Sequence, residues 1–181
     1  RGMDSPIPDI SLLSLLDTAL ARRRASTQPL EPEGAERLFH GFSEGYPRLV
    51  VDRYATTLVV FDATATSLDR ELWSGIRSWL AERRVELGSE AGVEIRSVLW
   101  KVRRGRAEER LGLWVQGGPE GAPREIVEDG VRYAVELRLQ ADASFYLDTR
   151  ELRRWLRAAP VAPPALVRDL DGRRDRRRGR G

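Results

Sequence analysis

The sequence contains no apolar residue after Leu170, and this abrupt end of its hydrophobic pattern limits where a folded core can lie. The last 14 residues, 168–181, hold seven arginines and three aspartates, so they carry a net charge of +4. A segment whose one apolar side chain is Leu170 cannot bury enough surface to offset the entropy of ordering its backbone. We therefore predict that residues 168–181 form a disordered Arg/Gly-rich tail and that the folded body precedes them.

The basic character of the chain comes from this tail rather than from the body. The whole chain carries +3, so the 167 residues before the tail together carry −1. Lys101 is the only lysine among 31 basic residues, which resembles a coding bias more than a selected phosphate-binding surface. A pI near 9.8 is therefore weak evidence for a nucleic-acid-binding face on the body.

The composition excludes several classes of site. The chain has no cysteine, so it contains no disulfide, thiolate metal site or cysteine nucleophile. It has a single histidine, so serine–histidine catalysis would depend on His40, and we expect no metal site. No run of 18 apolar residues occurs, so no membrane span is expected. The sequence before residue 30 has no signal-peptide pattern, which favours the cytoplasm.

The hydrophobic periodicity predicts alternating helices and strands. Helical spacing predicts helices over 9–24, 67–84 and 148–158, and β-rich segments predict strands over 48–54, 57–64, 94–103 and 111–116. Asp129-Gly130 predicts a hairpin between 125–127 and 131–139. Residues 26–34 are expected to form a loop, and 104–110 a charged turn. This order predicts an α+β fold with a small mixed or antiparallel sheet.

Finer features follow from the same pattern. Asp9 or Ser11 is available to cap the first helix, and Ser67 or Asp69 the second. In 131–139, apolar and polar residues alternate, which predicts one buried and one solvated face. In the last helix Leu152, Trp155 and Leu156 share a face that we expect to point inward.

Two segments are more specific than composition. The first runs from Arg37 to Gly41 and on through Glu44–Tyr54. Its Gly45 and Pro47 are typical of a turn, its valines of strand core, and its neighbours Asp52 and Arg53 of a salt bridge. The segment is interpreted as scaffold or, alternatively, as a direct RNA contact. The second segment is Ser144–Arg154, which begins shortly after the predicted hairpin.

Together, in this order and with the hairpin between them, the two segments resemble the large-subunit ribosomal RNA cytosine-5 methyltransferase family and its S-adenosylmethionine (SAM)-dependent relatives. The resemblance runs from about Leu12 to Leu156. It implies a small α+β domain over 9–118 that engages RNA. It also implies that residues 123–167 are the opening hairpin and helix of a Rossmann-like, SAM-dependent methyltransferase domain that is not completed here.

The resemblance also implies a cofactor, SAM, and candidate residues for it at Phe145, Tyr146, Asp148 and Arg150. SAM has a carboxylate that Arg150 can pair, an ammonium from which Asp148 can accept, and a sulfonium suited to the aromatic faces of Phe145 and Tyr146. The alternative is structural, with Asp148 as a helix N-cap and both aromatics in the core.

The sequence departs from the family in ways that affect its function. Arg48 replaces a turn glycine, and 167–170 begin a strand that the tail interrupts. The cofactor glycine turn, the catalytic motifs and the cysteine are missing, so no catalytic residue is assigned. We expect a truncated, N-terminal portion of a SAM-dependent RNA methyltransferase that acts on ribosomal RNA and is inactive alone. The alternative is a non-enzymatic RNA-binding module with an Arg-rich tail.

Overall fold

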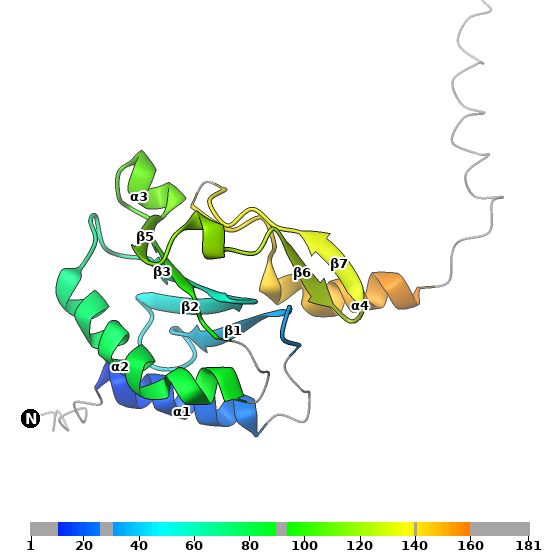
Figure 1. Ribbon diagram of the computed structural model, residues 1–181, viewed down its shortest axis with the longest axis horizontal. Helices are drawn as coiled ribbons and strands as arrows, with labels where there is room; N and C mark the ends of the chain where they lie inside the picture. The colour runs from blue at the N-terminus through cyan, green and yellow to red at the C-terminus, as the bar shows by residue number, and fades with distance from the viewer. Residues whose placement is uncertain (1–10, 26–30, 90–93, 140, 160–181) are drawn as a thin grey trace, which may run out of the picture. The chain divides into compact units, whose positions relative to one another are not determined.

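The computed structural model describes residues 11–25, 31–89, 94–139 and 141–159 (Figure 1). The chain divides into two compact units, residues 1–147 and 148–181. The predicted tail, 168–181, and the unfinished strand at 167–170 lie outside the described residues. The domain boundary predicted between residues 118 and 123 stays a prediction.

The first unit is organised around a five-stranded mixed sheet with strand order β1-β2-β3-β4-β5. Its strands are β1 (Ala35–His40), β2 (Leu49–Tyr54), β3 (Thr57–Asp62), β4 (Ser97–Val102) and β5 (Leu113–Gln116). Only β3 and β4 run parallel, and helix α2 (Arg70–Ser89) connects them. Parallel neighbours need such a crossover, whereas antiparallel ones are joined by short turns. The predicted α+β class with a mixed sheet is confirmed.

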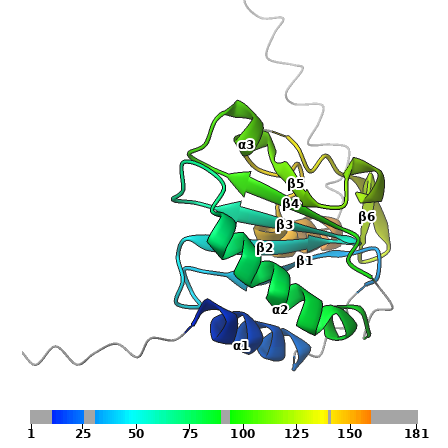
Figure 2. The same ribbon diagram turned by 60° about the vertical axis from the view of Figure 1, so that its left-hand side comes forward.

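Helices α1 (Leu12–Arg24) and α2 lie together on one face of this sheet (Figure 2). Apolar side chains at helical spacing meet alternate residues of the strands, and the buried cluster includes Leu16, Leu20, Ile76, Trp79, Val51, Val60 and Trp100. Ser11 accepts from the Ser14 amide and Asp69 from the Leu72 amide, so each helix uses one of its two predicted capping residues.

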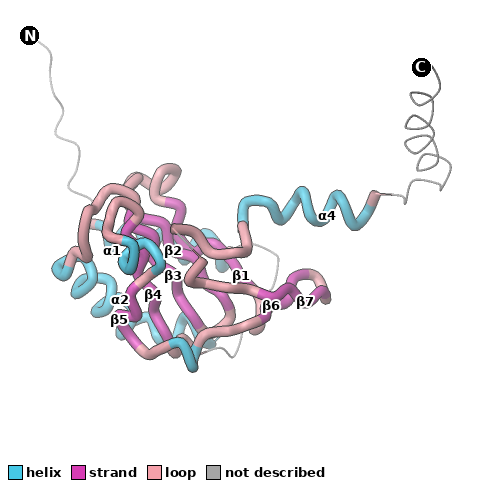
Figure 3. The backbone as a smooth tube through the Cα atoms, turned by 90° about the horizontal axis from the view of Figure 1, so that it is seen from above, coloured by secondary structure: helices cyan, strands magenta, loops and turns pink. Residues whose placement is uncertain are grey.

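The opposite face of the sheet is also covered. A hairpin, β6 (Glu125–Glu128) and β7 (Val131–Ala134), lies beside β1 (Figure 3), and the chain that follows it crosses the sheet. The buried cluster on this face includes Ala35, Tyr54, Val59, Phe61, Leu99, Ile126, Leu137 and Phe145. Every residue of β3 and β4 is therefore buried.

Three local features differ from the sequence predictions. The pattern does not predict β1, because a bulge between Arg37 and Phe39 breaks its alternation. The predicted charged turn contains a short helix, α3 (Ala107–Leu111), whose start is fixed when Glu109 accepts from the Arg106 amide. Strand β7 ends at Ala134 rather than at Leu139, but Tyr133, Val135 and Leu137 are half-buried or buried between exposed neighbours, so the predicted alternation holds over 132–138.

The second unit contains one described helix, α4 (Arg150–Ala158), entered through a 3₁₀ turn over Leu147–Thr149. The predicted helix is confirmed. Its apolar stripe does not point inward as predicted: Leu152, Trp155 and Leu156 are 54%, 65% and 57% exposed. Spacing defines an apolar face, but burial requires a partner surface, which spacing does not supply.

Candidate functional site

The first motif forms the β1–turn–β2 unit, and an ion pair joins its two strands. Arg37 lies directly opposite Asp52 in the register, and its guanidinium donates to both carboxylate oxygens over 2.8 and 3.2 Å. Asp52 is only 2% exposed. A bidentate ion pair of this kind fixes the orientation of the guanidinium and carboxylate planes, and it offsets the cost of burying the carboxylate. These two residues therefore act as scaffold.

Arg53 is also part of the scaffold. It pairs with Glu36 over 2.6 Å and donates to the carbonyls of Glu31 and Ala55, which ties the chain before β1 to the end of β2. The sequence predicted a salt bridge between the neighbours Asp52 and Arg53. The structure gives each of them a partner on β1 instead, because consecutive strand residues point to opposite faces.

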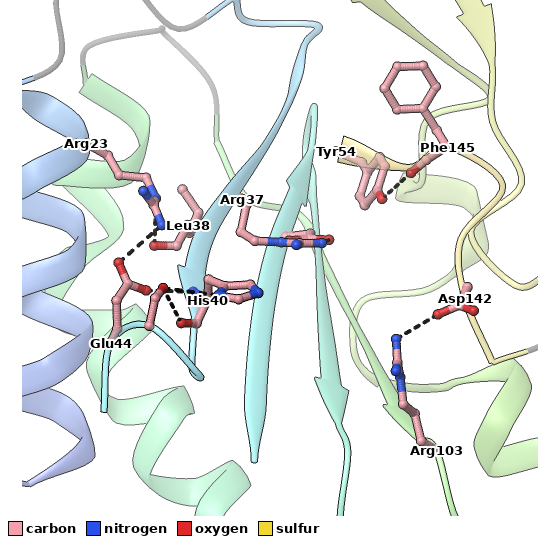
Figure 4. A network of polar contacts seen from close by, with 11 residues as sticks. Arg23, Arg37, Leu38, His40, Glu44, Tyr54, Arg103, Asp142 and Phe145 are labelled. Atoms are coloured by element: carbon pink, nitrogen blue, oxygen red, sulfur yellow. Dashed lines mark hydrogen bonds and ion pairs between the residues drawn. The ribbon is translucent and has the colours of Figure 1, made fainter. Parts of the chain in front are cut away.

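The turn between these strands is anchored to helix α1. The Glu44 carboxylate accepts from the His40 amide at 2.6 Å and from Arg23 of α1 at 3.2 Å (Figure 4). His40 makes a 3.0 Å side-chain contact with Ser43, also within the turn. Gly41 has no room for a side chain, since a Cβ would lie 2.0 Å from the Tyr46 carbonyl oxygen.

Arg48, the departure from the family turn, has a structural role. Its guanidinium donates to both oxygens of the buried Asp62 and to Asp69, the cap of α2. The amide of Leu72 and the Arg48 charge hold the pKa of Asp69 below its ordinary value. Arg48 therefore joins the turn, β3 and the start of α2.

The second motif begins with a segment that packs on the sheet face opposite the helices. We call residues 142–147 the lead-in segment. The Tyr54 hydroxyl donates to the Phe145 carbonyl over 2.9 Å, and Arg103 pairs with the Asp142 carboxylate over 2.9 Å (Figure 4). The Lys101 ammonium donates to the Asp142 carbonyl over 2.8 Å. Three side chains from two strands and the following loop thus hold this segment.

Lys101 is the residue that sequence reasoning missed. Its side chain is fully buried in β4, and loss of hydration lowers its pKa to about 8, against the opposing effect of Asp142. The signal for it in the sequence is a single lysine, within an apolar strand, in a chain that otherwise uses arginine. Arginine binds with a rigid fork, whereas lysine presents a compact charge on a flexible stem.

The four predicted cofactor residues are divided between the two units. Phe145 and Tyr146 end the first unit: the Phe145 ring is buried against Tyr133, with centroids 5.1 Å apart, and Tyr146 is 56% exposed. Asp148 and Arg150 belong to the second unit, where Asp148 is exposed and Arg150 half-buried. Thr149, rather than Asp148, occupies the N-cap position of α4. Cofactor binding by these four residues stays a prediction.

The described residues contain no group of three or more histidine, cysteine, aspartate or glutamate side chains placed to hold a metal ion. Among the helices of that same part of the chain, none is long and apolar enough to cross a membrane.

Comparison with known proteins relates the chain to methyltransferases. It is 34% identical to a ribosomal RNA large subunit methyltransferase of Deinococcus radiodurans, over an alignment of 164 positions that covers 84% of this chain. The alignment covers 37% of that relative, so the chain spans little more than a third of the relative's length. No protein-family model matches the chain.

Two solved structures share the fold. One is assigned as a SAM-dependent methyltransferase from Streptococcus mutans; it has a TM-score of 0.54 and 18% identity over 80% of this chain and 34% of its own. The other is a methyltransferase complexed with SAH. It has a TM-score of 0.57 and 18% identity, and the match covers 83% of this chain and 35% of that structure's chain. The chain is thus similar in sequence to an rRNA methyltransferase and in fold to part of methyltransferases that use SAM.

Proposed function

We propose that this chain is the part of a SAM-dependent ribosomal RNA methyltransferase that precedes the cofactor domain and is inactive by itself. The observation that carries the proposal is the 34% identity to an rRNA methyltransferase over most of this chain. The two motifs support it, because the chain carries both in the family's order. In this proposal the first unit engages RNA, and the lead-in segment begins the connection to the cofactor.

Within the proposal, four residues face the methionine end of SAM. Arg150 pairs the cofactor carboxylate and Asp148 accepts from its ammonium, while Phe145 and Tyr146 supply apolar surface near the sulfonium. The support differs among them: Tyr146 and Asp148 are exposed, Arg150 is half-buried, and the Phe145 ring already packs in the core. Arg150 is therefore the sharpest residue to test.

The chemistry of the reaction lies outside these 181 residues. Methylation at cytosine C5, the position that the family resemblance implies, requires a nucleophile that adds to the ring, normally a thiolate. This chain has no cysteine, so in our proposal that group belongs to a further domain. A cytoplasmic location, where ribosomal RNA would be the substrate, is part of the same proposal. Mass spectrometry of modified rRNA nucleosides identifies the methylated base.

A chimera tests the proposal. Residues 1–158 are joined to the portion of the Deinococcus relative that follows the aligned region, and SAM binding is measured by titration calorimetry. We expect binding by the chimera and no measurable binding by the 181-residue chain. An exposed ion pair contributes only about 0–1 kcal/mol, whereas millimolar affinity already needs about 4 kcal/mol. A correctly folded chimera that neither binds SAM nor methylates rRNA would show that the proposed function is wrong.

Arg150→Ala in this chimera tests the residue assignment. A charge-assisted hydrogen bond in a closed site contributes about 1.5–3 kcal/mol, so SAM affinity should fall roughly 10- to 100-fold. Arg157→Ala is the matched control, because it removes the same group from the other end of α4. Equal affinities for the two variants would leave Arg150 as scaffold.

The alternative, a free-standing RNA-binding module, is favoured by the +4 charge of residues 168–181. Arginine-rich tails bind phosphates with little sequence preference and a steep salt dependence. RNA affinity of the whole chain is compared with that of a chain ending at Ala165, at two salt concentrations. If the shortened chain binds equally well, the tail plays no part in binding.

A further inference from the structure

Two buried side chains of the sheet hold the main chain of the lead-in segment. Tyr54 stands at the end of β2 and Lys101 in β4, and they are 1% and 0% exposed. Their polar ends donate to carbonyl oxygens of the segment, Tyr54 to Phe145 over 2.9 Å and Lys101 to Asp142 over 2.8 Å. The two side chains therefore bind the segment at two carbonyl oxygens, which lie three residues apart in the sequence.

These contacts differ from ordinary packing because they fix the backbone. A donor aimed at a carbonyl oxygen sets the position of the main chain whatever side chain stands there, and it is strongest where water is excluded. Burial leaves Lys101 with a pKa of about 8, so at neutral pH it still donates as a cation. Between these two carbonyls, the Ser144 amide donates to the Glu136 carbonyl over 3.0 Å.

We propose that Tyr54 and Lys101 are positioning residues that fix the backbone of the lead-in segment on the sheet. The inference rests on the proposed function, in which this segment connects the RNA-engaging unit to the cofactor. Neither side chain needs to touch SAM or RNA. They act through the backbone of residues 142–145, which ends immediately before Tyr146 and Asp148.

Amide hydrogen exchange of the 181-residue chain, followed by NMR, tests this role. The Ser144 amide reports on the segment, and the amides of β3, buried in the middle of the sheet, report on global stability. Tyr54→Phe removes one hydroxyl and leaves the ring. Loss of a buried hydrogen bond of ordinary strength should raise Ser144 exchange about tenfold relative to the β3 amides. Lys101→Met should have an effect in the same direction.

Tyr46→Phe is the matched control, because Tyr46 packs against the cluster on the helix face of the sheet. It should leave the ratio of Ser144 to β3 exchange unchanged. If Tyr54→Phe instead accelerates both sets of amides equally, Tyr54 only stabilises the fold, and the proposal is overturned; an unchanged ratio overturns it as well. The assay needs no cofactor, so its failure is distinguishable from failure of the chimera to bind SAM.

Discussion

Replacing Lys101 by methionine tests how strongly the fold disfavours the buried charge. The two side chains have similar length, so the substitution removes the ammonium and leaves most of the packing. The variant loses the 2.8 Å bond to the Asp142 carbonyl, a charged hydrogen bond that contributes about 1.5–3 kcal/mol. It also relieves the desolvation that lowers the pKa of Lys101 from 10.5 to about 8, which costs about 3 kcal/mol at pH 7. The two effects oppose each other there.

The pH dependence separates them. Between pH 8 and 10.5 the unfolded chain binds more protons at Lys101 than the folded chain does, so stability rises with pH in this window. From these two pKa values the wild type should gain about 2 kcal/mol relative to Lys101→Met between pH 7 and 9.5. Groups whose titration is the same in both proteins cancel in this difference.

Urea unfolding followed by tryptophan fluorescence, at several pH values over this range, measures the difference. Arg103→Met is the control, because it removes a guanidinium, a permanently charged group, that contacts the same residue, Asp142. Its stability relative to wild type should stay constant. If the difference for Lys101→Met also stays within about 0.5 kcal/mol, Lys101 is not desolvated as argued and the reasoning fails.

Three further predictions concern the scaffold. Arg37→Ala should destabilise the chain by about 3 kcal/mol in denaturant unfolding, because it leaves the buried Asp52 carboxylate without this partner; a loss below about 1 kcal/mol would contradict this. Gly41→Ala should cost more than about 2 kcal/mol and lower the melting temperature, since its Cβ meets the Tyr46 carbonyl. Asp17→Asn should remove stability that is present above pH 4 and lost as pH falls, because an arginine of α2 lowers the pKa of this half-exposed carboxyl; identical acid profiles would refute it.

The local sequence pattern was sufficient to predict the helices and turns whose formation depends on residues close together in the chain. The apolar stripe of 67–84 predicted α2, whose Ile76 and Trp79 are buried at helical spacing. Asp129-Gly130 predicted the hairpin, and both residues have the positive φ, 51° and 76°, that its turn requires. In these cases the residues that define an element lie within one or two turns of each other.

The resemblance to methyltransferases was likewise available from short segments. Two motifs, their order and the hairpin between them indicated a large-subunit rRNA methyltransferase, and the chain is 34% identical to a protein of that description. What the short segments did not reveal was the role of their charged residues. Arg37 and Arg53 each have a carboxylate partner on the neighbouring strand of the β1–β2 pair. The register of these two strands cannot be read from the motif alone.

The sequence by itself thus determined which segments are helical or extended and which family they resemble, because those properties depend on periodicity and local motif. Only the tertiary structure decided which backbone and side-chain groups the buried polar residues bind. Lys101 and Asp142 are 41 positions apart, and Tyr54 and Phe145 are 91 apart. Whether a buried lysine or tyrosine finds an acceptor depends on which distant backbone the fold brings against it, and a burial without such a partner would be unfavourable.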